Sequence, residues 1–266
     1  MQGSYGATLE RLGSLEANIG LLIAENDALR AEAKKEDENL LNLMHELRMR
    51  LCDLYHSCSD ASWRWFEDCF TYSNGIMPLA LFHSLEIMPD ESVQQVAKES
   101  TRFLEEVTLA DGFCRPIGCE SFYSKGEERS VFDQQPVDVY AKVLLFLQAW
   151  KVTGKERFYK SALLCNSWFY GKNELHLPLY DPETGGCCDG LTATGVNQNQ
   201  GAESTLACLI ARLAIEEAMT KHDGAGGTSA PKDEKELPKY PRQNEFAPPK
   251  PRHWQHSEKI VSVANL

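Results

Sequence analysis

Apolar residues recur at three- and four-residue spacing along most of the chain, and no credible run of β-strands interrupts them. This spacing puts apolar side chains on one face of a helix and is not typical of a half-buried strand. We therefore expect an all-α protein. The expected helices run from Leu9 to Leu54, near Ile76 to Glu86, from about Asp90 to Val107, from Asp133 through VLLFLQAW, over KERFYKSALLCNSWFYGKN, and from Gly201 to Met219.

Several polar and special residues predict where these helices begin and end. Asp90 and Asp133 precede apolar periodic segments and are typical N-caps. Pro136 falls in the first turn after Asp133, where its missing N–H costs little. Gly171 is expected to end the return helix as a C-cap. The apolar face expected for the helix that begins at Asp133 consists of Val137, Tyr140, Ala141, Leu144 and Leu147.

The first 35 residues carry a seven-residue apolar repeat. Asn26 occupies an a position, where a buried amide can fix the register of a two-stranded coil. One alternative is a homodimer through this repeat, and the other is a helix that packs on its own domain or stays loose. Leu40, Leu47 and Leu54 continue the a register, although Glu36 and Arg50 interrupt the d positions. The heptad residues proposed for the homodimer are Leu12, Leu15, Ile19, Leu22, Asn26 and Leu29.

Composition changes twice along the chain and predicts three parts. Residues 1–35 form the heptad-like helix, residues 36–220 form the helical domain, and residues 221–266 form a tail. The tail is rich in proline, glycine and charge with few aliphatic residues, so we expect it to be disordered.

Charge and hydropathy exclude several classes of partner. The formal net charge is -12 in 266 residues, which repels a nucleic acid backbone. The longest apolar runs fall short of the roughly 18 to 20 residues that span a bilayer, and the N-terminus lacks the basic and apolar regions of a secretory signal. We therefore expect an intracellular, cytoplasmic protein that binds neither nucleic acid nor membrane.

Nine cysteines occur without the paired spacing of a zinc site, so free and mostly buried thiols are expected. The adjacent Cys187 and Cys188 leave a redox role as the alternative. Asp181 and Asp189 flank a glycine pair and predict either Asx-type turns that brace a loop or a cation site, of which we favour the turns. No cofactor or metal is expected.

Polar residues and aromatic rings concentrate in the loops between the helices, most densely in YDPETGGCCDGLTATGVNQNQGAES. Helical hairpins packed side by side form an α/α toroid or solenoid, in which loops at one end of the helices meet. Aromatic faces stack on sugar rings, and carboxylates and amides bind vicinal hydroxyls. The pattern therefore predicts a carbohydrate cleft. Its expected lining is Trp63, Trp65, Glu67, Tyr72, Asn74, Asp133, Gln134, Gln135, Asp189, Asn197, Gln200 and Glu203.

Five segments, from about Trp63 to Met219, resemble the six-hairpin glycosidase-like superfamily, in the branch found alone or fused behind bacterial glycosyltransferases. They are WRWFEDCFTYSNGIMPLAL, FDQQPVDVYAKVLLFLQAW, WFYGKN, LYDPETGGCCDGL and VNQNQGAESTLACLIARL. The resemblance implies an α/α toroid and carbohydrate metabolism. Two features depart from the branch. Tyr72 to Gly75 reads Tyr-Ser-Asn-Gly where the branch tends to read Tyr-Asp-Asn-Ala, and about seven or eight helices are present where six hairpins need twelve.

Glycoside hydrolysis needs one carboxylic acid and one carboxylate, and the candidates are Glu67, Asp133 and Glu203. Each has a simpler interpretation: Asp133 is a helix cap, Glu203 is a favourable first-turn charge, and Glu67 is a solvent-exposed acid. Two classes of function remain open. The first is a carbohydrate-active domain, hydrolytic or transferring, and the second is a noncatalytic module that binds a glycan or a protein.

Overall fold

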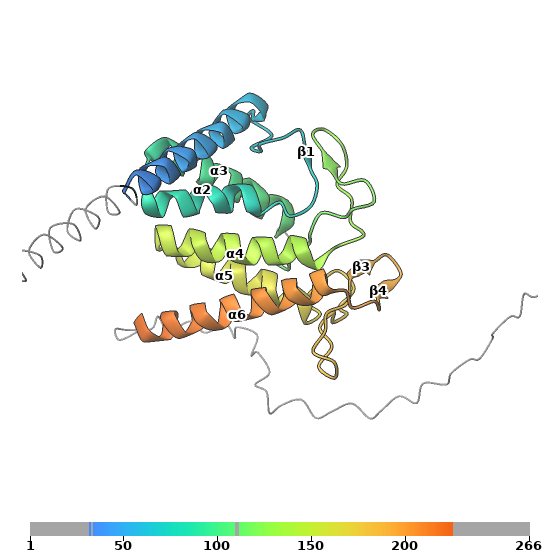
Figure 1. The fold of residues 1–266 in the computed structure, drawn as a ribbon. Coiled ribbons are helices and arrows are strands. Elements are labelled where there is room, and N and C mark those ends of the chain that lie inside the picture. The colour runs from blue at the N-terminus through green and yellow to red at the C-terminus, as the bar shows by residue number, and fades with distance from the viewer. Residues whose placement is uncertain (1–31, 33, 110–111, 226–266) are drawn as a thin grey trace, which may run out of the picture.

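The computed structural model describes residue 32 and residues 34–109 and 112–225, and this part is mainly helical (Figure 1). The predictions for residues 1–31 and for the tail beyond residue 225 lie outside the described residues. The helices are an N-terminal helix over residues 34–58, α2 (Ile76–Ile87), α3 (Glu91–Thr108), α4 (Pro136–Thr153), α5 (Glu156–Asn166), the short 3-10 helix η1 (Ser167–Phe169) and α6 (Ala202–Ala225).

Helix α4 is the centre of the helical array. It contacts α2, α5 and α6, and α2 in turn contacts α3 (Figure 1). Because neighbours surround it, α4 is buried on more sides than one apolar face. The expected face was therefore incomplete: of its five residues only Ala141 is fully buried. The fully buried apolar residues of α4 are Val139, Ala141, Val143, Leu145, Phe146 and Ala149.

The start of α3 confirms a sequence prediction, whereas the start of α4 corrects one. Asp90 caps α3, and its Oδ1 accepts hydrogen bonds from the backbone N–H groups of Ser92 and Val93 at 2.9 and 3.0 Å. Helix α4 begins later than expected, with Gln135 in the cap position and Pro136 in the first turn. Asp133 is therefore not the cap of this helix.

The aromatic loop that follows the N-terminal helix belongs to the core. The rings of Trp63, Phe70, Phe103 and Tyr123 meet edge to face, tilted or stacked, with centroids 5.2 to 6.0 Å apart. Offset and edge-to-face contacts of this kind stabilise a core beyond simple burial. They also fix β1 (Cys69–Phe70) beside β2 (Tyr123–Ser124), its antiparallel partner.

A short β-hairpin lies between α5 and α6. Strand β3 (Gly190–Thr192) pairs antiparallel with β4 (Gly195–Asn197). The β1–β2 pair and this hairpin project at the same end of the helical array (Figure 1). The sequence predicted the gathering of loops at one end, but it did not predict these strands.

The N-terminal helix uses one face to contact the domain and leaves another open. Arg48, Cys52 and Tyr55 are buried. Arg48 donates to the carbonyl of Met88 at 2.6 Å, and the Tyr55 hydroxyl donates to Glu99 at 2.6 Å. The leucines of the a register do not pack on the domain: Leu40, Leu47 and Leu54 are all exposed.

All nine cysteines are described and free, and six of them are buried, as the sequence predicts. Burial raises the pKa of the Cys188 thiol, so this thiol is less nucleophilic than an exposed one. In the described part of the chain, no helix is both long enough and apolar enough to cross a membrane.

Candidate functional site

A backbone bridge joins the start of α4 to the hairpin ahead of α6. The N–H groups of Gln134 and Leu191 each donate to the other residue's carbonyl at 2.9 Å. The two backbones approach so closely that a Cβ added to Gly190 would lie 2.8 Å from the Gln134 carbonyl oxygen. This bridge holds the segment around Gln134 against the strand that follows Asp189.

Asp189 organises the segment that leads into α6. Its carboxylate accepts hydrogen bonds from the Asn199 amide and from the backbone N–H of Gly201, the latter at 2.8 Å. The hydrogen bond from Asn199 is the main reason why the pKa of Asp189 is lowered, and a hydrogen bond from Ser204 lowers it further. Ser204 follows Glu203, so Glu203 lies in the turn that Asp189 holds.

Asp181 and Gln200 brace the other side of the same loop. Gln200 donates to Asp181 at 3.0 Å and accepts from Thr184 at 2.8 Å. The backbone N–H of Glu183 donates to Asp181 at 2.9 Å, which is an Asx-type turn. The turn interpretation of Asp181 is thus confirmed. Among the described residues, no three His, Cys, Asp or Glu side chains converge as a metal site would require.

The three candidate catalytic carboxylates do not share one environment. Asp133 is half-buried, and its carbonyl accepts from the backbone N–H of Cys119 at 2.9 Å. Glu203 is exposed on the first turn of α6. Glu67 is exposed just ahead of β1, where it borders an open depression of about 660 Å³. The depression is lined by Glu67, Asp68, Cys69, Thr71, Ser124 and Lys125.

Four of the residues expected to line the cleft are buried in the domain. Trp63, Trp65, Asn74 and Gln134 have side chains between 0% and 3% exposed, so they do not form a surface that a sugar could contact. Tyr72 is different, because 58% of it is exposed. The other expected residues remain accessible: Gln135 and Asp189 are half-buried, and Asn197 and Gln200 are exposed.

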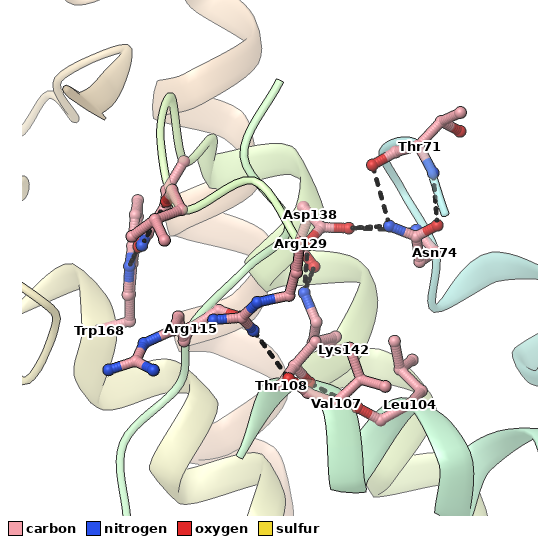
Figure 2. Close-up of polar contacts among 12 residues, drawn as sticks. Thr71, Asn74, Leu104, Val107, Thr108, Arg115, Arg129, Asp138, Lys142 and Trp168 are labelled. Atoms are coloured by element: carbon pink, nitrogen blue, oxygen red, sulfur yellow. Dashed lines mark hydrogen bonds and ion pairs between the residues drawn. The ribbon is translucent and has the colours of Figure 1, made fainter. Parts of the chain in front are cut away.

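Gln134 has a structural role that explains its burial. Its Oε1 accepts from Trp168 Nε1 at 2.8 Å, and its Nε2 donates to the Val131 carbonyl at 3.0 Å (Figure 2). Both ends of the amide are therefore bonded within the protein. The side chain holds the start of α4 against η1.

A buried polar network near the start of α4 was not predicted from the sequence. Asp138 and Lys142 form an ion pair one helical turn apart on α4, and both are almost completely buried (Figure 2). Burial is the largest single influence and by itself would lower the pKa of Lys142, but the charge and hydrogen bond of Asp138, together with Cys114 and Cys165, raise it. The signal in the sequence is an Asp and a Lys four residues apart within an otherwise apolar helix.

Arg129 ties the loop of residues 112–130 to the end of α3. Its guanidinium donates to the carbonyls of Val107 at 2.7 Å and Arg115 at 3.2 Å (Figure 2). Arg115 in turn forms an ion pair with Glu174, with 2.5 Å between Nε and Oε2. The bond to Val107 satisfies a carbonyl that the end of α3 leaves open, and the bonds of Arg129 and Arg115 add to the β1–β2 pairing in fixing the loop.

We compared the chain with models of protein families and with curated protein sequences. No family model matches it, and no curated protein matches it.

Proposed function

We propose that this chain is a carbohydrate-binding helical domain of the α/α-toroid type, with a sugar site at the loop end of the helices. The observation that carries the proposal is the Gln134–Leu191 bridge. It joins two loops that are far apart in sequence: one has Asp133 and Gln135 on either side of Gln134, and the other has Asp189 two residues before Leu191. Carboxylates and amides in such a cluster can each form paired hydrogen bonds to vicinal hydroxyl groups.

Asp133 and Glu203 are the best pair for glycosidase-like chemistry. Asp133 precedes Gln134 of the bridge, and Glu203 precedes Ser204, which bonds to Asp189. Such a reaction uses one carboxyl group to protonate the glycosidic oxygen and the other as base or nucleophile. Glu67 lies just ahead of β1, where it lines a separate depression. We assign Glu67 no part in the reaction.

One observation favours a second candidate, a noncatalytic module that binds a glycan or a protein. Trp63 and Trp65 are in the core, so they are not available to stack on a sugar ring. Asp189 and Asn199 are also bonded to each other. Glycosidase catalysis also distorts the bound sugar ring. Without these aromatic rings and free polar groups, the site is better suited to binding than to catalysis.

The test is a thermal-shift and turnover screen against oligosaccharides and sugar nucleotides. The parent chain is compared with Asp133→Asn, Glu203→Gln and the matched control Glu217→Gln, which changes an exposed acid farther along α6. We expect a ligand to raise the melting temperature of the parent and of the control, but not of the two site variants. Product formation identifies the enzyme, and binding without product identifies the noncatalytic module.

A well-folded parent that binds nothing in the panel would contradict the proposed function. Equal stabilisation of the parent and both site variants would place the sugar elsewhere on the domain. If Glu203→Gln lowers only the melting temperature of the free protein, its role is that of a first-turn charge.

A further inference from the structure

The N-terminal helix presents a row of leucines that no described residue covers. Leu40, Leu43, Leu47 and Leu54 are 64%, 51%, 51% and 39% exposed. They lie on one side of the helix, because residues seven apart occupy nearly the same angle around its axis. The face that contacts the domain is a different one, about a third of a turn away, and it includes Arg48 and Tyr55. The helix therefore has two apolar faces and uses one of them.

The exposed row follows a heptad register. Leu40, Leu47 and Leu54 are at a positions and Leu43 is at a d position. The same register, counted back in sevens, includes the repeat from Leu12 to Leu29. No glycine or proline occurs in residues 21–60, so the sequence has no residue that typically breaks a helix there. Exposed leucines and sequence repeat are thus parts of one pattern.

We propose that two copies of this chain pair in parallel as a two-stranded coiled coil, with these leucines as its seam. A second copy fits better than another partner because a and d leucines are self-complementary in a two-fold interface. The parallel direction follows from Asn26, which is at an a position and meets its own copy only when the strands are parallel and in register.

Two d positions depart from an ideal seam. Glu36 and Arg50 occupy them in place of apolar residues. Arg50 already forms an ion pair with Glu46, one turn away, with 2.5 Å between Nη2 and Oε1. The pairing leaves less charge to desolvate when a second helix approaches. These residues reduce the stability of the seam without opposing its register.

The domain carries a second exposed apolar row, which serves as a matched control. Leu206, Leu209, Ile210 and Leu213 are exposed along α6. Leu206, Leu209 and Leu213 have the same three- and four-residue spacing as Leu40, Leu43 and Leu47, but they lie on a separate helix and do not continue the N-terminal repeat. We propose no partner for this row.

The test measures the mass of the full chain in solution by light scattering after size exclusion. We expect twice 29.9 kDa for the parent. The double variant Leu40→Glu with Leu47→Glu should have the monomer mass, because it places like charges across the seam at exposed positions. The control Leu209→Glu with Leu213→Glu should remain dimeric. Circular dichroism and melting temperature check that each variant is folded.

Three results would overturn the proposal: a monomeric parent, a dimer that survives the charges at Leu40 and Leu47, or a dimer that only the α6 variants dissociate. Direction is tested with Leu40→Cys. In a parallel pair, mild oxidation should join the peptide that contains residue 40 to its own copy, as mass spectrometry of the digest would show. Absence of this self-linked peptide from a dimeric variant would refute the parallel arrangement.

Discussion

Asn74 and Asp138 lie 64 residues apart in sequence, and one carboxylate oxygen joins them. The backbone N–H and the side-chain amide of Asn74 both donate to Asp138 Oδ1 at 3.1 Å. The Asn74 amide also bonds both the N–H and the carbonyl of Thr71. Asp138 therefore holds the loop ahead of α2 against the first turn of α4, while its second oxygen pairs with Lys142.

Replacing Asp138 with alanine should destabilise the fold strongly. The change leaves the Lys142 ammonium buried and unpaired, and breaking a buried pair in this way costs about 3 to 5 kcal/mol. Denaturant unfolding followed by circular dichroism measures the loss. The matched control is Glu217→Ala, which breaks the exposed pair with Lys221 at the same four-residue spacing. It should change stability little, and equal effects would contradict a structural role for Asp138.

Replacing Gln134 with leucine should cost about 1 to 3 kcal/mol, because it leaves the buried Trp168 N–H without its acceptor. Tryptophan emission should change together with the unfolding midpoint. Gln198→Leu is the matched control, since Gln198 is exposed and its one bond, to the Val196 carbonyl, is 3.5 Å long. A Gln134 variant as stable as the control would show that this hydrogen bond adds nothing.

Replacing Asp90 with alanine should lower the melting temperature, because two N–H groups at the start of α3 lose their acceptor. The variant Asp90→Ser distinguishes the effect of the capping hydrogen bonds from the effect of the negative charge. Serine keeps a capping oxygen but loses the contact with Arg48, where 3.6 Å separates Nη2 from Oδ2. We expect serine to restore most of the lost stability, and a serine variant as unstable as alanine would assign the effect to the charge.

The loop at Asp189 should loosen in acid. The hydrogen bond from Asn199 is the main cause that lowers the folded-state pKa of Asp189 below 3.8. A carboxylate whose pKa is lower in the folded state stabilises the fold fully at pH values above its unfolded-state pKa. This stabilisation is lost as the pH falls through its folded-state pKa. The difference in melting temperature between the parent and Asp189→Asn should therefore shrink below about pH 4. A difference that stays constant with pH would contradict this role.

Local signals in the sequence predicted the helices well. Asp90 caps α3 as expected, because a cap depends on neighbouring residues alone. Asp133 has the same local pattern, but the following residues pair with Leu191 from a distant loop, which delays the helix to Pro136. Long-range pairing of this kind leaves no mark in the residues around a cap.

The candidate site was predicted in part, since composition distinguishes polar from apolar residues but not surface from core. Gln135, Asp189 and Gln200 are accessible, as polar loop residues usually are. Trp63 and Gln134 are not, because an aromatic ring and an amide with internal partners are stable in the interior. Leu47 departs in the opposite direction: it is an apolar helix residue left exposed, and only the three-dimensional packing reveals it.

The buried free thiols can serve as native probes of local unfolding. The six buried cysteines are distributed over the N-terminal helix, the loop after α3, α5, the loop before β3 and α6: Cys52, Cys114, Cys165, Cys187, Cys188 and Cys208. A buried thiol reacts with an alkylating reagent only after its surroundings open. The order in which the six become labelled therefore reports, without any introduced probe, the order in which the parts of the fold come apart.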